Sequence, residues 1–369
     1  MQKHVIATGC LLAFAAVPAT AANIEFNGVA NAEVASVSGD GYGGNEGLMV
    51  TDAMRRDGKY GGNETWLGIK GSQDVGNGYT AIARARLKVR PGNWGFNKAS
   101  KYLSDTGDPQ GASPETSGAN NDSLFSGRDA FAGIKGPFGS VTIGTMSSPY
   151  KSTTVKWDPL KGTFLQARGQ GGMSRAQNSY LPNTIAYGNK FGGAKVKLSM
   201  TMDESEDPDN AGEANGEHGY SFGATLPLGD ATDLAIGYQD LGDKMDFADE
   251  GSSSAKVAVR HQSGGLTLVG QYETTENYAT NYDNAADFVY GSATWAFDDK
   301  NELILSLGAN EDTNDGDNDA KGDTSGTYAA LGMKHHFSKK ARVHGGLIHS
   351  ASDDLDDYTG IGAGFRVNF

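Results

Sequence analysis

Apolar and polar side chains alternate along most of the chain, and the connections between the alternating segments are long and short in turn. A period of two is the pattern of a β-strand whose two faces meet different surroundings. Helical periodicity is hard to find, and no run of roughly 18 apolar residues is present that could span a bilayer as a helix. The sequence therefore predicts an all-β fold.

Sixteen alternating segments can be marked, and most are close to the roughly 9–11 residues that a tilted strand needs to cross a bilayer. A soluble β-sandwich has no reason to place every long loop at one end. A transmembrane antiparallel β-barrel with short periplasmic turns and long extracellular loops does so by rule. The predicted strands are 24–37, 62–70, 79–90, 124–136, 139–146, 181–190, 194–203, 218–227, 231–240, 254–262, 265–274, 286–297, 301–310, 326–337, 341–350 and 357–369.

The segment "YTAIARARLKVR" (79–90) indicates which face of the strands meets water. Arg84, Arg86, Lys88 and Arg90 fall on one face, and apolar side chains fall on the other. Charges turned toward lipid at mid-membrane would cost roughly 2–4 kcal/mol each. We therefore expect the cations to face an aqueous lumen; the alternative, a solvated strand of a soluble protein, does not explain the loop pattern.

The first residues resemble a signal for export. A short basic start at Lys3 precedes an apolar run and the small residues Ala19, Ala21 and Ala22, which predicts a signal peptide over 1–22 and a barrel over 23–369. Cleavage after Ala21 is the alternative. Cys10 lacks the leucine that a lipoprotein signal would place three residues before it. Because Cys10 is the only cysteine and lies in the predicted signal peptide, the exported chain carries no disulfide.

Acidic residues gather in the long connections. The stretches 203–217, 310–326 and 351–357 hold seven, six and four acids, with a single lysine among them. The second stretch is not an EF-hand, because Ala320 and Gly326 stand where a calcium loop needs Gly and Glu. Loosely bound divalent cations bridging to anionic lipid are one interpretation, and a solvated charge run is the other; no other cofactor is expected.

Aromatic residues mark the short turns and the chain end. A ring of aromatic side chains at one level is typical of the membrane interface of a barrel. The residues are Phe138, Phe191, Phe297, Phe337 and Phe369.

The remaining polar residues do not form a recognisable catalytic or metal-binding motif. His335 and His336 are adjacent and so point to opposite strand faces, which is poor geometry for one metal ion. His344 and His349 share a strand, but no nucleophile motif accompanies them. We therefore expect neither an enzyme nor a metal site.

Three segments resemble the general Gram-negative outer-membrane porins. They are "ETWLGIKGSQDVGNGYTAIARARL" (64–87), "SGRDAFAGIKGPFGSVTIG" (126–144) and "SRAQNSYLPNTIAY" (174–187). The resemblance covers essentially the whole exported chain. One departure is Thr145, which stands where many relatives carry an arginine.

The resemblance implies a sixteen-stranded barrel in the outer membrane, assembled as a homotrimer, whose third long loop folds into the channel. It implies passive diffusion of small hydrophilic solutes and ions, contacts with lipopolysaccharide, and no role in binding nucleic acid. It also implies that the last strand is read by the barrel-assembly machinery, through Phe365, Val367 and Phe369.

The expected channel lining is basic. The wall contributes Arg84, Arg86, Lys88, Arg90 and Arg128, and few lumen-facing acids (Glu25, Glu33, Glu64) are available to offset it. A ring of one sign at a narrow point decides which ion enters, so we predict modest anion selectivity. In the third long loop, 147–180, one acid accompanies five cations: Lys151, Lys156, Asp158, Lys161, Arg168 and Arg175.

Two other functions stay open from the sequence. One is a channel specific for a small anion such as phosphate. The other is a structural or adhesin barrel that acts through its acidic loops.

Overall fold

The computed structural model describes residues 22–39, 47–51, 64–89, 125–178, 180–202, 206–207, 210–214, 218–241, 252–276, 285–312, 325–352 and 357–369. The predicted signal peptide lies outside these residues, apart from Ala22. In the part of the chain that is described, no helix is long and apolar enough to cross a bilayer.

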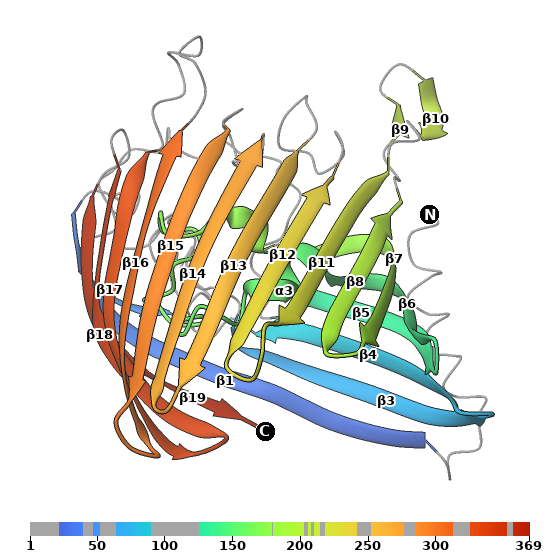
Figure 1. Ribbon diagram of the computed structural model, residues 1–369, viewed down its shortest axis with the longest axis horizontal. Coiled ribbons are helices and arrows are strands. Elements are labelled where there is room, and N and C mark those ends of the chain that lie inside the picture. Colours follow the sequence, from blue (N-terminus) through green and yellow to red (C-terminus); the bar gives the residue numbers. More distant parts are fainter. Residues whose placement is uncertain are drawn as a thin grey trace, which may run out of the picture.

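Sixteen antiparallel strands close into a barrel (Figure 1), as the alternation of side chains predicts. In chain order they are β1 (Ala22–Ser38), β3 (Trp66–Gly76), β4 (Tyr79–Val89), β5 (Phe125–Gly136), β6 (Gly139–Ser147), β7 (Tyr180–Phe191), β8 (Ala194–Thr201), β11 (Gly219–Pro227), β12 (Thr232–Asp240), β13 (Ser253–Ser263), β14 (Leu266–Glu276), β15 (Ala286–Ala296), β16 (Asn301–Asp312), β17 (Gly326–Ser338), β18 (Ala341–Ser352) and β19 (Tyr358–Asn368).

Short elements lie in the long connections. A strand β2 (Gly47–Thr51) pairs with the second half of β1, and β9 (Glu206–Asp207) pairs with β10 (Asn210–Ala214). The third long connection carries helix α3 (Pro149–Thr154) and a 3-10 helix, η3 (Arg175–Asn178). None of these elements was predicted, because a period-two pattern does not extend into them.

The barrel closes where its first and last strands meet. The first half of β1 pairs with β3, and its second half pairs with β19, from Val29 opposite Asn368 to Ser38 opposite Thr359. Phe369 continues this seam: its N–H donates to the Gly28 carbonyl at 3.1 Å and its carbonyl accepts from the Gly28 N–H at 3.0 Å. Closure leaves the barrel wall without the unpaired edges of an open sheet.

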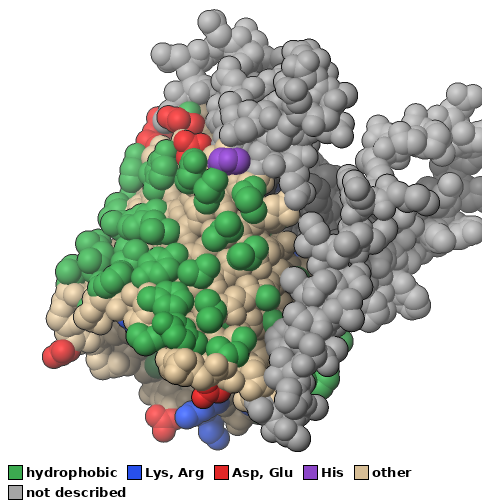
Figure 2. Space-filling model, turned by 90° about the vertical axis from the view of Figure 1, so that its right-hand side faces the viewer, with side chains coloured by type: hydrophobic (Ala, Val, Ile, Leu, Met, Phe, Trp, Pro, Cys, Tyr) green, Lys and Arg blue, Asp and Glu red, His purple; other side chains and the backbone are tan. Residues whose placement is uncertain are grey.

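The outer surface is apolar at mid-height. Figure 2 shows hydrophobic side chains gathered across one outer face, with charged groups toward both ends. On β16, Leu303, Leu305 and Leu307 are each between 39% and 49% exposed, which is the expected state of side chains that meet lipid. The phenylalanines at the short turns and at the chain end are exposed as well, in agreement with the predicted interfacial ring.

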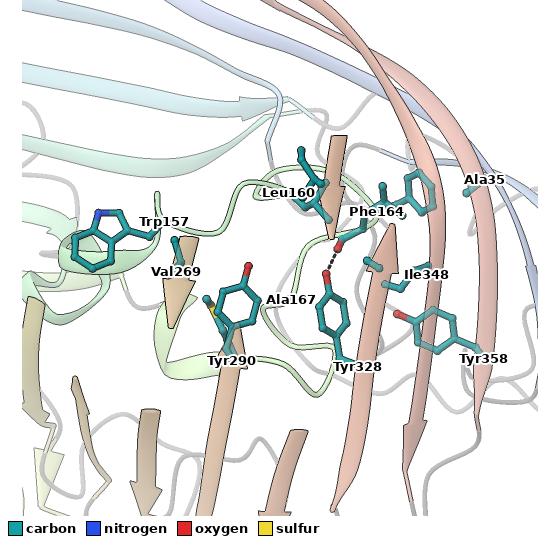
Figure 3. Packing of buried hydrophobic residues seen from close by; sticks show 14 of the residues in the cluster. Ala35, Trp157, Leu160, Phe164, Ala167, Val269, Tyr290, Tyr328, Ile348 and Tyr358 are labelled. Atoms are coloured by element: carbon teal, nitrogen blue, oxygen red, sulfur yellow. Dashed lines mark hydrogen bonds between the residues drawn. The ribbon is translucent and has the colours of Figure 1, made fainter. Parts of the chain in front are cut away.

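The lumen is not an open tube, because the segment between β6 and β7 folds into it. Figure 3 shows Leu160 and Phe164 of this segment directed toward the inner faces of the late strands, whereas the ring of Trp157 points away from Tyr290 and Tyr328. There they join a buried cluster that includes Tyr290, Tyr328, Ile348 and Tyr358. The inward-folded third loop that the family resemblance implied is thus present, and we call residues 148–178 the constriction loop.

Two glycines of the wall make this close packing possible. A Cβ on Gly223 of β11 would lie 2.1 Å from Thr153 Oγ1 of α3, and one on Gly308 of β16 would lie 2.5 Å from the Cα of Gly172. Glycine in the interior of a strand often marks such a close approach of backbone. Both positions therefore serve the docking of the constriction loop.

Candidate functional site

A cavity of about 1040 Å³ remains between the constriction loop and the wall formed mainly by β4 to β8. Its lining is cationic, with eleven Lys and Arg side chains against two carboxylates, Glu64 and Asp233. Asp233 is paired with Arg260, at 2.5 Å. The cations are Arg84, Arg86, Lys88, Arg128, Lys151, Lys156, Lys161, Arg168, Lys195, Lys197 and Arg260.

The cationic stripe of β4 is held by one buried carboxylate. Asp129 of β5 lies beneath the stripe with its side chain fully buried, and it accepts hydrogen bonds from both Arg84 and Arg86. These are charge-assisted contacts, which are stronger than neutral hydrogen bonds. Asp129 therefore keeps two like-charged side chains side by side on the wall.

A β-bulge explains how two consecutive residues of β5 both serve the lumen. Asp129 lies opposite Arg86, but the next pair is Gly127 opposite Leu87, so that Arg128 is an extra residue in β5. In a regular strand, neighbours point to opposite faces, and a bulge cancels this alternation locally. Asp129 and Arg128 consequently both face the channel side.

Aromatic rings support the guanidinium groups. Arg86 lies over the Trp66 ring at 4.8 Å, and Arg128 lies 6.0 Å from the same ring. Arg128 Nε also donates to the Tyr180 hydroxyl at 2.9 Å. Arginine stacks readily on aromatic faces, so these rings hold the charges in fixed positions.

Glu64 is the counter-ion of the loop cations. Its carboxylate is 2% exposed and lies 3.2 Å from Lys161, 3.7 Å from Arg168 and 3.4 Å from Arg366. Burial alone would raise the pKa of Glu64, but these cations, together with Arg128, hold the pKa well below its ordinary value. Glu64 is therefore ionised, and its charge is shared among several cations.

Two loop lysines titrate closer to neutrality than usual. Burial, opposed by Glu64 and reinforced by nearby cations, lowers the pKa of Lys161 to about 8. Burial and the charges of Arg168 and Arg128 also lower the pKa of Lys151 well below its ordinary value. Lys151 lies 3.6 Å from the centre of the Tyr180 ring and lines the cavity.

Glu273 of β14 anchors both ends of the constriction loop. Its buried carboxylate accepts hydrogen bonds from the Tyr150 hydroxyl at 2.5 Å, from Ser174 Oγ at 2.6 Å and N at 3.1 Å, and from Gln177 Nε2 at 3.2 Å. Tyr150 belongs to α3 and Gln177 to η3. One carboxylate thus ties the beginning and the end of the loop to the wall.

Glu33 of β1 holds the middle of the loop. Its carboxylate accepts from the Phe164 N–H at 3.0 Å and lies 2.6 Å from His344 Nε2. The sequence predicted Glu33 as a lumen-facing acid that would weaken the cationic field. It does lie inside the barrel, but it is buried under the loop, so it is engaged in packing.

Two of the predicted loop residues do not line the cavity. Asp158 is 4% exposed; its carboxylate accepts from the N–H groups of Leu160 and Ala167 at 2.8 and 3.1 Å, and burial raises its pKa. It therefore shapes the loop on the side turned toward the wall. Arg175 lies on η3, outside the lining of the cavity.

The remaining predicted residues divide as follows. Arg84, Arg86, Lys88, Arg128, Lys151, Lys156, Lys161 and Arg168 line the cavity, whereas Arg90 lies outside the described residues. Glu25 pairs with Lys70 at 2.5 Å near the short-turn end.

Five charged residues of the site were missed by the sequence analysis. They are Asp129, Lys195, Lys197, Asp233 and Arg260. A signal existed for two of them, because "AKVKL" (194–198) alternates Lys195 and Lys197 with apolar residues just as 79–90 does. The position of Asp129 depends on the bulge, which no pattern in the sequence reveals.

Within the described ranges, no group of three or more His, Cys, Asp or Glu side chains is placed to hold a metal ion. Most of the acidic stretches lie outside those ranges.

Comparison with known proteins places the chain in a family. Residues 7–355 match the model of a family described as Gram-negative porin. A search of curated protein sequences found no match. Solved structures share the fold at low sequence identity.

Three of these structures illustrate the likeness. The anion-selective porin from Comamonas acidovorans has a TM-score of 0.68 and 17% identity, covering 94% of this chain and 100% of that chain. Salmonella typhi OmpF in complex with daunomycin has a TM-score of 0.65 and 13% identity, covering 96% of this chain and 99% of that chain. A trimer form of OmpT from Vibrio cholerae has a TM-score of 0.59 and 14% identity, covering 95% of this chain and 100% of that chain.

Proposed function

The chain belongs to the Gram-negative porin family, and from this premise we propose that it is a passive diffusion channel of the outer membrane that favours small anions. Membership of a porin family indicates a channel rather than an enzyme. The observation that carries the ion preference is the cavity lining, in which eleven cations face two carboxylates that are themselves paired with cations.

The electrostatic argument depends on where the charges sit. A single sign of charge at a narrow point fixes which ion enters a channel, and narrow water-filled clefts with low-dielectric walls focus the field. The acidic stretches of the long loops oppose this preference. Mobile ions at physiological salt screen exposed charges over roughly 8–10 Å, so acids at a wide mouth weigh less than cations beside the constriction loop.

The anion-selective porin from Comamonas acidovorans shares the fold of this chain at 17% identity. A porin with an acidic loop opposite a basic wall would have a transverse field. Here the loop contributes Lys151, Lys156, Lys161 and Arg168 to the same cavity as the basic wall, so both sides attract anions.

We further propose that the barrel works as a homotrimer. A trimer form is known for one structural relative. On β4 and β5 the outward face is built of small side chains, since Ala83 lies opposite Ala132 and Ala85 opposite Ala130. Small residues allow protein surfaces to approach closely within a membrane. Lipopolysaccharide, divalent cations at the acidic loops and the barrel-assembly machinery complete the proposed set of partners.

Reversal potentials in a KCl gradient across a planar bilayer test the ion preference. We expect the purified channel to be anion-selective, and more so at low salt. Replacing Arg84→Glu together with Arg86→Glu should move the reversal potential toward cation selectivity. A cation-selective wild-type channel, or a double variant with an unchanged reversal potential, would contradict the proposal.

A further inference from the structure

Three lysines form a separate group within the cavity. Lys195 and Lys197 lie two residues apart on β8, so their side chains share the lumen face, and Lys156 follows helix α3 of the constriction loop. All three line the cavity. Lys195 comes directly after the short turn that joins β7 to β8, so the group lies toward the periplasmic end. We call these residues the lysine triad.

Several cations of the cavity form ion pairs with a carboxylate. Asp129 pairs with Arg84 and Arg86, and Glu64 pairs with Lys161 and Arg168. Arg260 pairs with Asp233. Among the described residues, no Asp or Glu forms an ion pair with Lys156, Lys195 or Lys197. Within the described ranges, the positive charge of the triad is therefore not offset by an ion pair.

The side chains of the triad are held near one another. Lys197 Nζ donates to Ser152 Oγ of α3 at 3.2 Å, and Ser152 Oγ in turn donates to the Pro149 carbonyl at 3.1 Å. This chain of hydrogen bonds ties a wall lysine to the loop. Lys197 also lies within electrostatic range of Lys156, Arg84 and Lys195, and like charges at such range repel unless an anion lies between them.

A hydroxyl group adds a neutral donor. Thr225 of β11 lies directly opposite Lys195 in the sheet register and also lines the cavity. Ammonium groups and a threonine hydroxyl together donate many hydrogen bonds and, with no carboxylate among them, suit an anion that carries several acceptor oxygens. A chloride ion would use this set of donors only in part.

We propose that the lysine triad, with Thr225, is a binding site for doubly charged tetrahedral oxyanions such as inorganic phosphate. The site is distinct from the cations that pair with Glu64. This inference deepens the proposed function and rests on it, because the oxyanion must reach the triad through the channel. Ser152 acts as a positioning residue, since its hydroxyl is committed to Lys197 and Pro149.

The test measures how inorganic phosphate reduces the chloride current. Single channels of the full-length protein are recorded at constant KCl, slightly above neutral pH, while potassium phosphate is raised. We expect a saturable reduction in conductance for the wild type. In Lys195→Gln and Lys197→Gln, the half-blocking concentration should rise roughly tenfold or more, as expected from the loss of a charge-assisted hydrogen bond.

Two control variants make the outcome specific. Lys135→Gln removes a lysine from β5, outside the cavity lining, and should leave the block unchanged. Lys197→Arg keeps the charge and should retain most of the block, which separates the loss of binding from misfolding.

The possible results decide between the two proposals. If the wild-type reversal potential shows anion selectivity but phosphate does not reduce the chloride current, the proposal of an oxyanion site is wrong and the proposal of an anion-selective channel stands. If phosphate blocks Lys195→Gln and Lys197→Gln as strongly as the wild type, phosphate binds elsewhere, and the proposal of a site at the lysine triad is also wrong. A cation-selective wild type would contradict the proposed function itself.

Discussion

The hydroxyl of Tyr150 donates a hydrogen bond to the buried carboxylate of Glu273 across 2.5 Å, and this contact joins helix α3 to the barrel wall. Ser174 and Gln177, at the other end of the constriction loop, donate to the same carboxylate. One side chain of β14 therefore fixes both ends of the loop.

Replacing Glu273→Ala should loosen the constriction loop. Three side chains lose their acceptor at once, and each buried donor left unsatisfied costs roughly 1–3 kcal/mol. We expect a lower Tm and a noisier, larger single-channel current. Tyr150→Phe, which removes one of the bonds, should show a smaller change of the same kind; a quiet, wild-type current in Glu273→Ala would show that the loop is held by its apolar contacts alone.

Replacing Asp129→Asn should strengthen the anion preference and weaken the fold. The variant removes the one negative charge that Arg84 and Arg86 share, so the cationic wall gains a net positive charge beside the cavity. The two guanidinium groups then repel each other, and we expect a loss of roughly 1–3 kcal/mol in the free energy of unfolding. Reversal potentials at low salt and thermal melts measure the two effects.

The matched control for this variant is Asp299→Asn. Asp299 is an exposed acid of the short turn between β15 and β16, and its loss changes the net charge of the protein by the same amount. An equal shift in selectivity from this control would mean that net charge, rather than the position of Asp129, matters.

Anion selectivity should decline as the pH rises from neutral through about 8, the pKa of Lys161. The lysine loses its proton over this interval, and the cavity loses a cation beside Glu64. Because the pKa in the folded state lies below that of the unfolded chain, the unfolded state binds more protons above pH 8, and stability should rise slightly there.

Reversal potentials measured over this pH interval check the expectation. Lys161→Arg, whose guanidinium stays protonated, should flatten the profile, and the double variant with Lys151→Arg should flatten it further, since the pKa of Lys151 is also lowered. An unchanged pH profile in the double variant would assign the titration to other groups.

Replacing Ala132→Trp should break the proposed homotrimer. A large ring on the small-residue face of β4 and β5 would hold two barrels apart, while Leu305→Trp on β16 places the same ring on a face already built of large side chains. Unheated electrophoresis should show monomers for the first variant and oligomers for the second. Oligomers in both would move the contact surface to another part of the wall.

Replacing Phe369→Ala should reduce the amount of assembled barrel. The substitution keeps the two backbone hydrogen bonds to Gly28 but removes the terminal ring that the family resemblance assigns to recognition by the barrel-assembly machinery. Heat-modifiable mobility of the protein in outer-membrane fractions measures assembly. Normal yield in Phe369→Ala, together with a defect on deletion of the residue, would attribute its role to closing the seam.

The period-two pattern predicted the barrel well where one face meets lipid and the other meets water. The strand expected over 79–90 is observed as β4 over Tyr79–Val89, bounded by the Asn77–Gly78 turn, where both residues have positive φ. The strand expected over 62–70 begins later and extends to Gly76 as β3, because its second half, "GSQDVG", is too polar and glycine-rich to show alternation.

The interior of the barrel was less predictable. The lumen was expected to be lined by polar groups, yet Leu160 and Phe164 form an apolar core with Tyr290 and Tyr328. A loop has no fixed periodicity, so its buried face cannot be separated from its exposed face by spacing. The roles of Glu33 and Asp158 likewise depend on contacts between residues far apart in the chain.

The pairing of β1 with β19 makes closure of the barrel a late step in folding. These strands come from opposite ends of the described chain, and contacts between distant residues form slowly because a long loop must close first. The first strand has no partner on one side until the last has been synthesised and exported. The barrel therefore cannot close until translation and export of the whole chain are complete.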